Sequence, residues 1–187
     1  DSTNLTVENN EFFNWANAGQ FYRNDNLTVG HNNVHSIRTD GFDFVDVHGA
    51  LIEGNYIHDF VKAEGSGDHM DMIQFWEGSG IPNSDIVIRS NIFNSGSGDW
   101  TQSIFMRNGT AENGGGPETF WQNITIVDNV IYNGHAHGIT VGETNNLTIS
   151  NNTILTNQDN IFSDPSINIA DISTNVYITN NIIPYLN

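Results

Sequence analysis

The sequence contains no cysteine and only one lysine among its 187 residues. The absence of cysteine excludes disulfides, thiolate metal sites and cysteine nucleophiles. Lysine and arginine together number 5 against 22 aspartate and glutamate residues, which gives a formal net charge of −17. A chain so poor in basic residues is not expected to bind nucleic acid or an anionic membrane surface. No apolar run approaches the length of about 18 residues that a transmembrane helix needs.

Asparagine, in contrast, is abundant and regularly placed. It accounts for 29 of the 187 residues, and seven segments align with an asparagine at the same place in each. The aligned residues are Asn10, Asn32, Asn55, Asn91, Asn129, Asn152 and Asn181. They are separated by 22, 23, 36, 38, 23 and 29 residues, and a period near 22 with longer insertions is typical of a solenoid.

Each aligned segment alternates apolar and polar side chains, as at Leu5 and Val7 or at Ile124 and Ile126. This period of two predicts a strand with one buried face. We expect the aligned asparagine that ends the strand to adopt a left-handed conformation in a tight turn. A second short strand follows the turn, and a third lies upstream of the segment. Three strands per coil predict an all-β parallel β-helix of about seven coils, with the aligned asparagines stacked as an internal ladder.

The repeat spans residues 1–187, so we expect a single solenoid domain. Both ends of the sequence resemble strands of incomplete coils, and no polar cap is recognisable. Because solenoids need such caps, we expect the sequence to be a fragment of a longer chain, or its coil ends to contact other chains. Two long insertions, residues 61–84 and 96–122, interrupt the turns on either side of the upstream strand. Such insertions should border a cleft over the outer face of that strand.

Aligning the upstream strands by their apolar residues gives columns of side chains on this outer face. The outward column consists of Asp43, Gln74, Phe105 and Thr140. A neighbouring outward column consists of Gly41, Met72, Ser103 and Gly138. Further polar and aromatic residues lie at the ends of the same strands: Asp40, His69, Asp71, Trp76, Arg107 and His137. Because these side chains gather between long loops, we predict a binding groove.

The groove residues suit proton transfer on an acidic polysaccharide. Removing the proton next to a uronate carboxylate requires a partner for the carboxylate, a base and a proton donor. Arg107 is expected to pair with the carboxylate, and His69 and His137 are candidates for the base and the acid. His135 lies two residues before His137, and in an extended segment we expect only one of these two rings to face the groove.

The repeat resembles that of right-handed parallel β-helix proteins, which include pectate and alginate lyases, mannuronan C5-epimerases and glycoside hydrolases. The stretches TDGFDFVDVHG, GDHMDMIQFW, WTQSIFMRNG and HAHGITVGE resemble secreted bacterial β-helix proteins described as epimerase-like. The resemblance implies a right-handed β-helix, a polysaccharide partner, an extracellular location and a groove on the outer face of the aligned strand. DGFDF matches only part of the Tyr-Gly-Phe-Asp-Pro-His stretch of the alginate epimerases, because the Pro-His pair is missing.

Two alternatives remain open from the residues alone. Paired carboxylates such as Asp43 and Asp71 are compatible with glycoside hydrolysis, in which one acts as general acid and the other as base or nucleophile. An acidic solenoid is also compatible with a non-catalytic module of an adhesin, a surface layer, a phage spike or a filament. In that case the coil ends would contact neighbouring chains.

We favour a secreted polysaccharide lyase or C5-epimerase that acts on an anionic, uronate-containing polysaccharide. The catalytic candidates are His69, Asp71, Arg107 and His137. The substrate-binding candidates are Asp43, Gln74, Trp76 and Phe105. Carboxylates are the ligands that Ca²⁺ prefers, and the candidate ligands for this cofactor are Asp40, Asp43 and Asp71.

Overall fold

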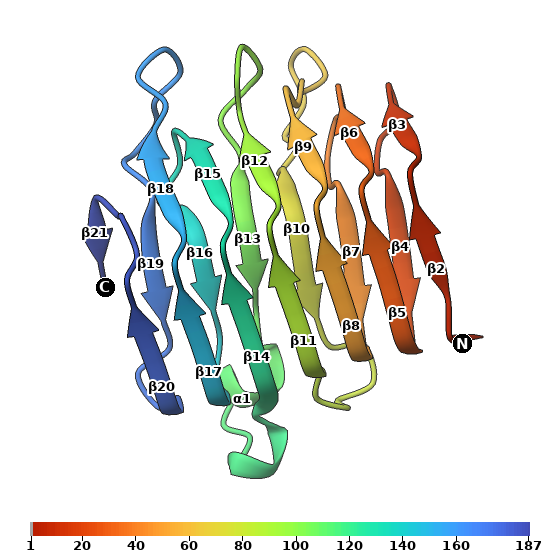
Figure 1. Cartoon of the computed structure of the whole chain (residues 1–187), viewed down its shortest axis with the longest axis vertical. Coiled ribbons are helices and arrows are strands. Elements are labelled where there is room, and N and C mark those ends of the chain that lie inside the picture. The colour runs from red at the N-terminus through yellow and green to blue at the C-terminus, as the bar shows by residue number, and fades with distance from the viewer. Residues whose placement is uncertain (1) are drawn as a thin grey trace.

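In the computed structural model, which describes residues 2–187, the chain winds into a right-handed parallel β-helix (Figure 1). Each coil contributes one strand to each of three parallel sheets, which we call sheets A, B and C. Sheet A contains β1 (Ser2–Thr3), β2 (Thr6–Glu8), β5 (Asn24–Gly30), β8 (His48–Glu53), β11 (Ser84–Arg89), β14 (Trp121–Val127), β17 (Thr144–Ser150) and β20 (Thr174–Thr179).

Sheet B follows sheet A along each coil, and sheet C follows sheet B. Sheet B contains β3 (Glu11–Phe13), β6 (Asn33–His35), β9 (Tyr56–His58), β12 (Ile92–Asn94), β15 (Val130–Asn133) and β18 (Thr153–Thr156). Sheet C contains β4 (Gly19–Tyr22), β7 (Phe42–Val45), β10 (Asp71–Trp76), β13 (Gln102–Met106), β16 (His137–Val141), β19 (Ser166–Ile169) and β21 (Tyr185–Leu186). The predicted all-β solenoid is therefore confirmed.

The asparagine ladder lies at the corner between sheets A and B. The backbone N–H and the side-chain amide of Asn55 both donate to Oδ1 of Asn91, at 3.0 and 2.9 Å. Asn91 in turn donates to Oδ1 of Asn129 at 3.0 Å and to the carbonyl of Ile52 at 2.9 Å. The same pattern joins successive coils from Asn10 to Asn181. Because each amide satisfies backbone groups of a buried turn, the ladder fixes the corner of every coil.

The left-handed residue of each turn is the one before the ladder asparagine. The ladder residues themselves have ordinary backbone angles, so the prediction that they are left-handed was wrong. These preceding residues all have positive φ and are Asn9, His31, Gly54, Ser90, Asp128, Asn151 and Asn180. This arrangement turns the following amide inward, where it meets the amides of the neighbouring coils.

Apolar side chains fill the interior in stacks that run from coil to coil. Phe21, Phe44 and Phe75 form one such stack, with ring centroids 5.1 and 4.5 Å apart. Met72 also belongs to this core and is fully buried, as is its neighbour Ile73. The predicted second outward column was therefore wrong for Met72, and also for Ser103, which is fully buried. Met72 and Ile73 are successive residues of the core, so the alternation of inward and outward side chains is interrupted at the start of β10.

The long insertions lie at both ends of the sheet C strands, as predicted (Figure 1). Residues 61–70 precede β10, and residues 77–83 follow it. Residues 107–120 follow β13 and contain helix α1 (Gly109–Glu112) and the 3₁₀ helix η1 (Pro117–Thr119). No helix among residues 2–187 is long and apolar enough to cross a membrane. The outer face of sheet C is thus bordered by loops on two sides.

Candidate functional site on the outer face of sheet C

The predicted outward column is confirmed by the register of sheet C. Gln74 is paired with Asp43 on one side and with Phe105 on the other, and Phe105 is paired with Thr140. The column continues beyond the predicted residues at both ends, to Gln20 and Asn168. Neighbouring strands of a sheet lie about 4.8 Å apart, so this row of side chains follows the long axis of the solenoid.

Asp40, Asp43 and Asp71 form a carboxyl cluster at the start of the sheet C strands. The side-chain amide of Asn17 donates to both Asp40 and Asp43, at 3.2 and 3.3 Å. Gln20 donates to Asp43 at 3.0 Å, and the backbone N–H of Asp71 donates to Asp40 at 3.1 Å. Asn17 and Gln20 were not predicted as site residues, because their roles depend on which coil they face rather than on any local motif.

Burial raises the pKa of all three carboxyl groups. The pKa of Asp40 rises to about 7 because of burial and then because of the nearby charges of Asp43 and Asp71. The pKa values of Asp43 and Asp71 are also raised, mainly by burial. One oxygen of Asp43 and one of Asp71, Oδ1 in both, are buried without a hydrogen-bond partner in the described part of the chain. Such orphaned oxygens favour retention of a proton or the approach of an external ligand.

The raised pKa of Asp40 predicts an unusual dependence of stability on pH. Because the pKa rises from 3.8 to about 7 on folding, Asp40 favours the folded state at low pH and loses this contribution as pH rises through 7. We expect Asp40→Asn to stabilise the protein more at about pH 8 than at about pH 5, by about 2 kcal/mol after allowance for solvent screening. Urea unfolding at the two pH values measures this difference, and an equal effect at both would contradict it.

His69 is paired with the most deeply buried of these carboxylates. Its Nδ1 lies 3.0 Å from Oδ2 of Asp71, whose side chain is fully buried. This contact raises the pKa of His69 more than burial lowers it. Nε2 of His69 lies 2.5 Å from the amide of Gln102, whose oxygen is otherwise unpartnered in the described chain. Rotating that amide places its oxygen against the Nε2–H of an imidazolium ring, so the surroundings suit protonated His69.

His137 has the opposite electrostatic character. Its Nδ1 lies 2.7 Å from Oγ1 of Thr140, and its ring meets the ring of Phe105 edge-on at 5.0 Å. Burial lowers the pKa of His137, and the charge of His69 lowers it further. The surroundings therefore favour the charged form of the His69 ring and the neutral form of the His137 ring.

His135 lies beside His137 rather than on the opposite side of the strand. The two ring centroids are 5.1 Å apart. Burial lowers the pKa of His135 to about 4, with a further contribution from His137. The prediction that the rings point in opposite directions was wrong, because residues 134–136 form a bend and the alternation of an extended strand does not apply.

Arg107 lines a cavity of about 210 Å³ together with members of the outward column, Phe105, Thr140 and Asn168. Its Nε donates to Glu112 at 3.0 Å. Asp71 is paired with Gln102, and Arg107 lies five residues beyond Gln102. Five residues of a strand span about 17 Å. The structure therefore places Arg107 and the His69–Asp71 pair at opposite ends of the face, with His137 contacting the residues between them. Trp76, at the end of β10, borders a different cavity that also reaches Arg107.

The loops before sheet C carry an aromatic cluster beside His135. Trp100 stacks on His135 and on Phe162, with ring centroids 5.1 and 4.8 Å apart. The ammonium group of Lys62 lies 3.7 Å from the centroid of the Trp100 ring. Trp100 therefore packs against side chains from three other segments of the chain.

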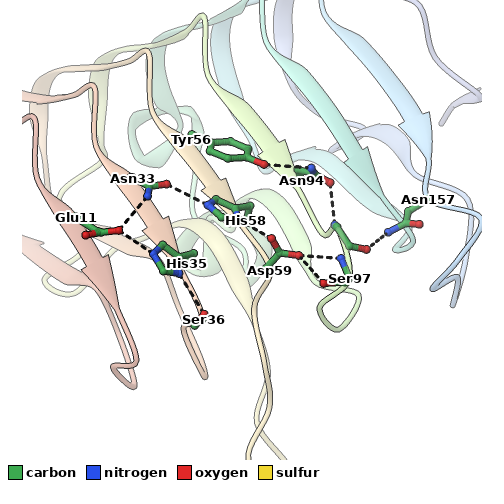
Figure 2. Close-up of polar contacts among 11 residues, drawn as sticks. Glu11, Asn33, His35, Ser36, Tyr56, His58, Asp59, Asn94, Ser97 and Asn157 are labelled. Carbon is green, nitrogen blue, oxygen red and sulfur yellow. Dashed lines mark hydrogen bonds and ion pairs between the residues drawn. The ribbon is translucent and has the colours of Figure 1, made fainter.

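A polar network on the outer face of sheet B holds these loops in place (Figure 2). His58 contacts Asp59 at 2.6 Å, and Asp59 accepts from the backbone N–H of Ser97 at 2.8 Å. Burial raises the pKa of Asp59, but the hydrogen bonds from His58 and Ser97 outweigh it and lower the pKa overall. Asn157 donates to the hydroxyl of Ser95 at 2.8 Å. The network joins the loop that carries Trp100 to the coils before and after it.

The carboxyl cluster contains the three residues predicted as Ca²⁺ ligands. The orphaned oxygens of Asp43 and Asp71 are ligands of the kind that Ca²⁺ prefers. However, no group of three or more histidine, aspartate or glutamate side chains within residues 2–187 is arranged to hold a metal ion. The assignment of Asp40, Asp43 and Asp71 as Ca²⁺ ligands stays a prediction.

Comparison with protein-family models, with curated protein sequences and with solved structures finds no match to this chain. The functional argument therefore depends on the geometry of the site itself.

Proposed function

We propose that the protein is a polysaccharide-processing enzyme that removes the C5 proton of a uronate residue, leading to β-elimination or C5-epimerisation. One observation supports this proposal above all. His137 contacts Phe105 and Thr140, two residues that line the Arg107 cavity, and burial favours its neutral form, whereas the pairing of His69 with Asp71 favours the charged form of that ring. Two titratable groups whose surroundings drive their pKa values apart are the usual arrangement of a base and an acid.

The open, loop-bordered face suits a polymer rather than a small molecule. A polysaccharide lying along the solenoid axis would pass over the outward column from Gln20 to Asn168. In this pose a uronate ring packs on Phe105, and its carboxylate accepts from the terminal nitrogens of Arg107. The half-buried column thus orients the sugar before any proton moves.

The proton transfer follows from the contacts of His137. We assign the Nδ1–H to the hydrogen bond with Thr140, which leaves the lone pair on Nε2. Nε2 takes the C5 proton, and the electron pair of the C–H bond passes to the uronate carboxylate. In β-elimination this pair then forms the C4–C5 double bond as the C4–O4 bond breaks, and a protonated group such as His69 delivers a proton to O4. In epimerisation the acid returns a proton to C5 on the opposite face.

The carboxyl groups on this face would repel a negatively charged uronate if all of them were ionised. Asp40, with its pKa near 7, retains a proton over much of the neutral range and can donate a hydrogen bond. The side-chain amides of Asn17 and Gln20 already donate hydrogen bonds to Asp43 of the same cluster. A Ca²⁺ ion held by the free oxygens of Asp43 and Asp71 would add positive charge when bound.

The activity is expected to follow a bell-shaped pH profile. It rises as His137 loses its proton, below the ordinary value of 6.5, because burial lowers its pKa. It falls as Asp40, with a pKa of about 7, and His69, whose pKa is raised by Asp71, lose their protons. In Asp40→Asn the amide donates at every pH, so the alkaline limb of kcat/KM should move to higher pH. An alkaline limb at the same pH in Asp40→Asn would show that the loss of activity is not caused by deprotonation of Asp40.

Incubation with alginate, pectate and neutral glycans, with Ca²⁺ or with EDTA, tests the proposal. Proton NMR of the products distinguishes the outcomes. Unsaturated ends indicate a lyase, and a changed ratio of uronate epimers without shortening indicates an epimerase. Saturated new reducing ends would instead support hydrolysis by the carboxyl cluster. No change in any polymer would overturn the catalytic proposal for this panel and favour a binding or filament-forming module.

A further inference from the structure

A second cavity lies on the other side of Arg107, where the loops leave β10 and β13. It has a volume of about 730 Å³ and is open to solvent, and its lining includes Trp76, Glu77 and Asn113. We propose that this cavity is a separate saccharide subsite that takes an uncharged pyranose residue. This inference rests on the proposed function in one respect, because it assumes that the ligand of this face is a polysaccharide.

Trp76 provides the apolar surface of the subsite. Its side chain is 41% exposed although it ends a strand of the central sheet. Its backbone is fixed by pairing with Val45 and by a 2.9 Å hydrogen bond from Asn83 to its carbonyl. Opposite the strand ends, a Cβ added at Gly114 would meet no atom within 4 Å. Trp76 and Gly114 line the same cavity, so the exposed indole borders open space that a sugar ring can occupy.

Glu77 specifies the chemical character of the ligand. Its Oε1 accepts from the backbone N–H of Thr110 at 2.5 Å, and its Oε2 is buried and has no hydrogen-bond partner within residues 2–187. An unpartnered carboxylate oxygen beside a cavity needs a donor. A sugar hydroxyl supplies a donor, whereas an ionised uronate carboxylate only accepts.

The charges around the cavity point the same way. Arg107 is the basic residue of the lining, and it is already paired with Glu112 at 3.0 Å. Glu112 lines the neighbouring Phe105 cavity, whereas Glu77 lines this one, so the additional carboxylate of Glu77 repels a second negative charge here. The free donors of Arg107 remain available to hydroxyl oxygens of a neutral sugar.

Arg107 borders both cavities, which has a consequence for the substrate. The Phe105 cavity offers its guanidinium to a uronate, and the Trp76 cavity beyond it takes a neutral residue. Because the two subsites are distinct, they hold two different sugar residues of one ligand. The structure thus points to a heteropolysaccharide in which uronate residues have neutral neighbours or neutral branches.

Indole NMR signals of the four tryptophans provide the test. Trp76→Phe identifies the Trp76 signal by its loss, and exposed Trp15 serves as the internal control. The protein is titrated with the methyl glycosides of glucose, mannose and galactose and with methyl glucuronide. At least one neutral glycoside should shift the Trp76 signal and bind about tenfold more tightly than the glucuronide. Glu77→Gln should reduce this preference about tenfold.

Two results would overturn the subsite. The Trp76 signal could stay unmoved by every neutral glycoside, or the glucuronide could bind at least as tightly as the best of them. The titration measures binding without turnover, so His137→Gln should leave the Trp76 shift intact. A Trp76 shift without turnover of any polymer would therefore refute the proposed function and leave the subsite standing.

Discussion

Replacing His137 by glutamine is expected to lower kcat by about two to four orders of magnitude, because the reaction then lacks its general base. Glutamine keeps a polar side chain of similar length that can still contact Thr140, so substrate binding should change little. KM should accordingly stay within a few-fold of the wild-type value. Initial rates on the polymer that gives products with the wild type measure both quantities.

His48→Gln is the matched control for this variant. His48 lies in sheet A, on a different face of the solenoid, where its Nδ1 is 3.1 Å from the hydroxyl of Ser84. We expect this variant to retain wild-type kcat. Comparable losses in the two variants would indicate a general effect of histidine replacement on the fold and would remove the support for His137 as the base.

His69→Gln and Asp71→Asn should also lower kcat, and they should change the alkaline limb of the pH profile. Asp71 acts through His69, because its carboxylate lies 3.0 Å from the ring and raises the pKa of that ring. Asp71 is thus a positioning residue. Asp71→Asn is expected to move the limb that belongs to His69 to lower pH, which a merely structural role would not do.

The largest effect on stability is expected from the asparagine ladder. Asn91 is fully buried, and its side chain accepts two hydrogen bonds from Asn55 and donates to Ile52 and Asn129. Asn91→Ala leaves the buried backbone N–H of Asn55 without its acceptor, at a cost of about 1–3 kcal/mol for each orphaned group. We expect a loss of about 4 kcal/mol in the free energy of unfolding.

Asn94→Ala provides the comparison for Asn91→Ala. Asn94 lies on the outer face of the same coil, is only half-buried, and makes a 3.4 Å contact with the hydroxyl of Tyr56 and a bond to Gly96. Its replacement should cost about 1 kcal/mol or less. Urea unfolding of the two variants measures the contrast. Equal losses would show that the ladder contributes no more than an ordinary surface asparagine.

The fold was predictable because each of its rules is local and repeated. Alternating apolar residues define the strands, and the recurring asparagine sets the register of successive coils. The same regularity placed Asp43, Gln74, Phe105 and Thr140 in one column, which the pairing of sheet C confirms. Because the same pattern recurs in every coil, it aligns segments that are far apart in the sequence, even where the turns between them differ in length.

The site was less predictable where the backbone departs from this repeat. The bend at residues 134–136 brings His135 beside His137, and Met72 joins the core next to Ile73 at the start of β10. Neither departure has a signature in the alternation of apolar residues. The contribution of Asn17 depends on which loop conformation brings its amide to Asp40 and Asp43, and this is set by tertiary contacts rather than by local sequence.

The fate of the uronate C5 hydrogen tests the central claim most directly. The reaction is run in D₂O on the polymer that the product assay identifies and is followed by NMR. Abstraction by His137 predicts deuterium at C5 of epimerised residues, or unsaturated ends that have lost the C5 hydrogen, and neither signal in His137→Gln. Products that keep the original C5–H, with saturated new ends, would contradict proton abstraction and indicate hydrolysis.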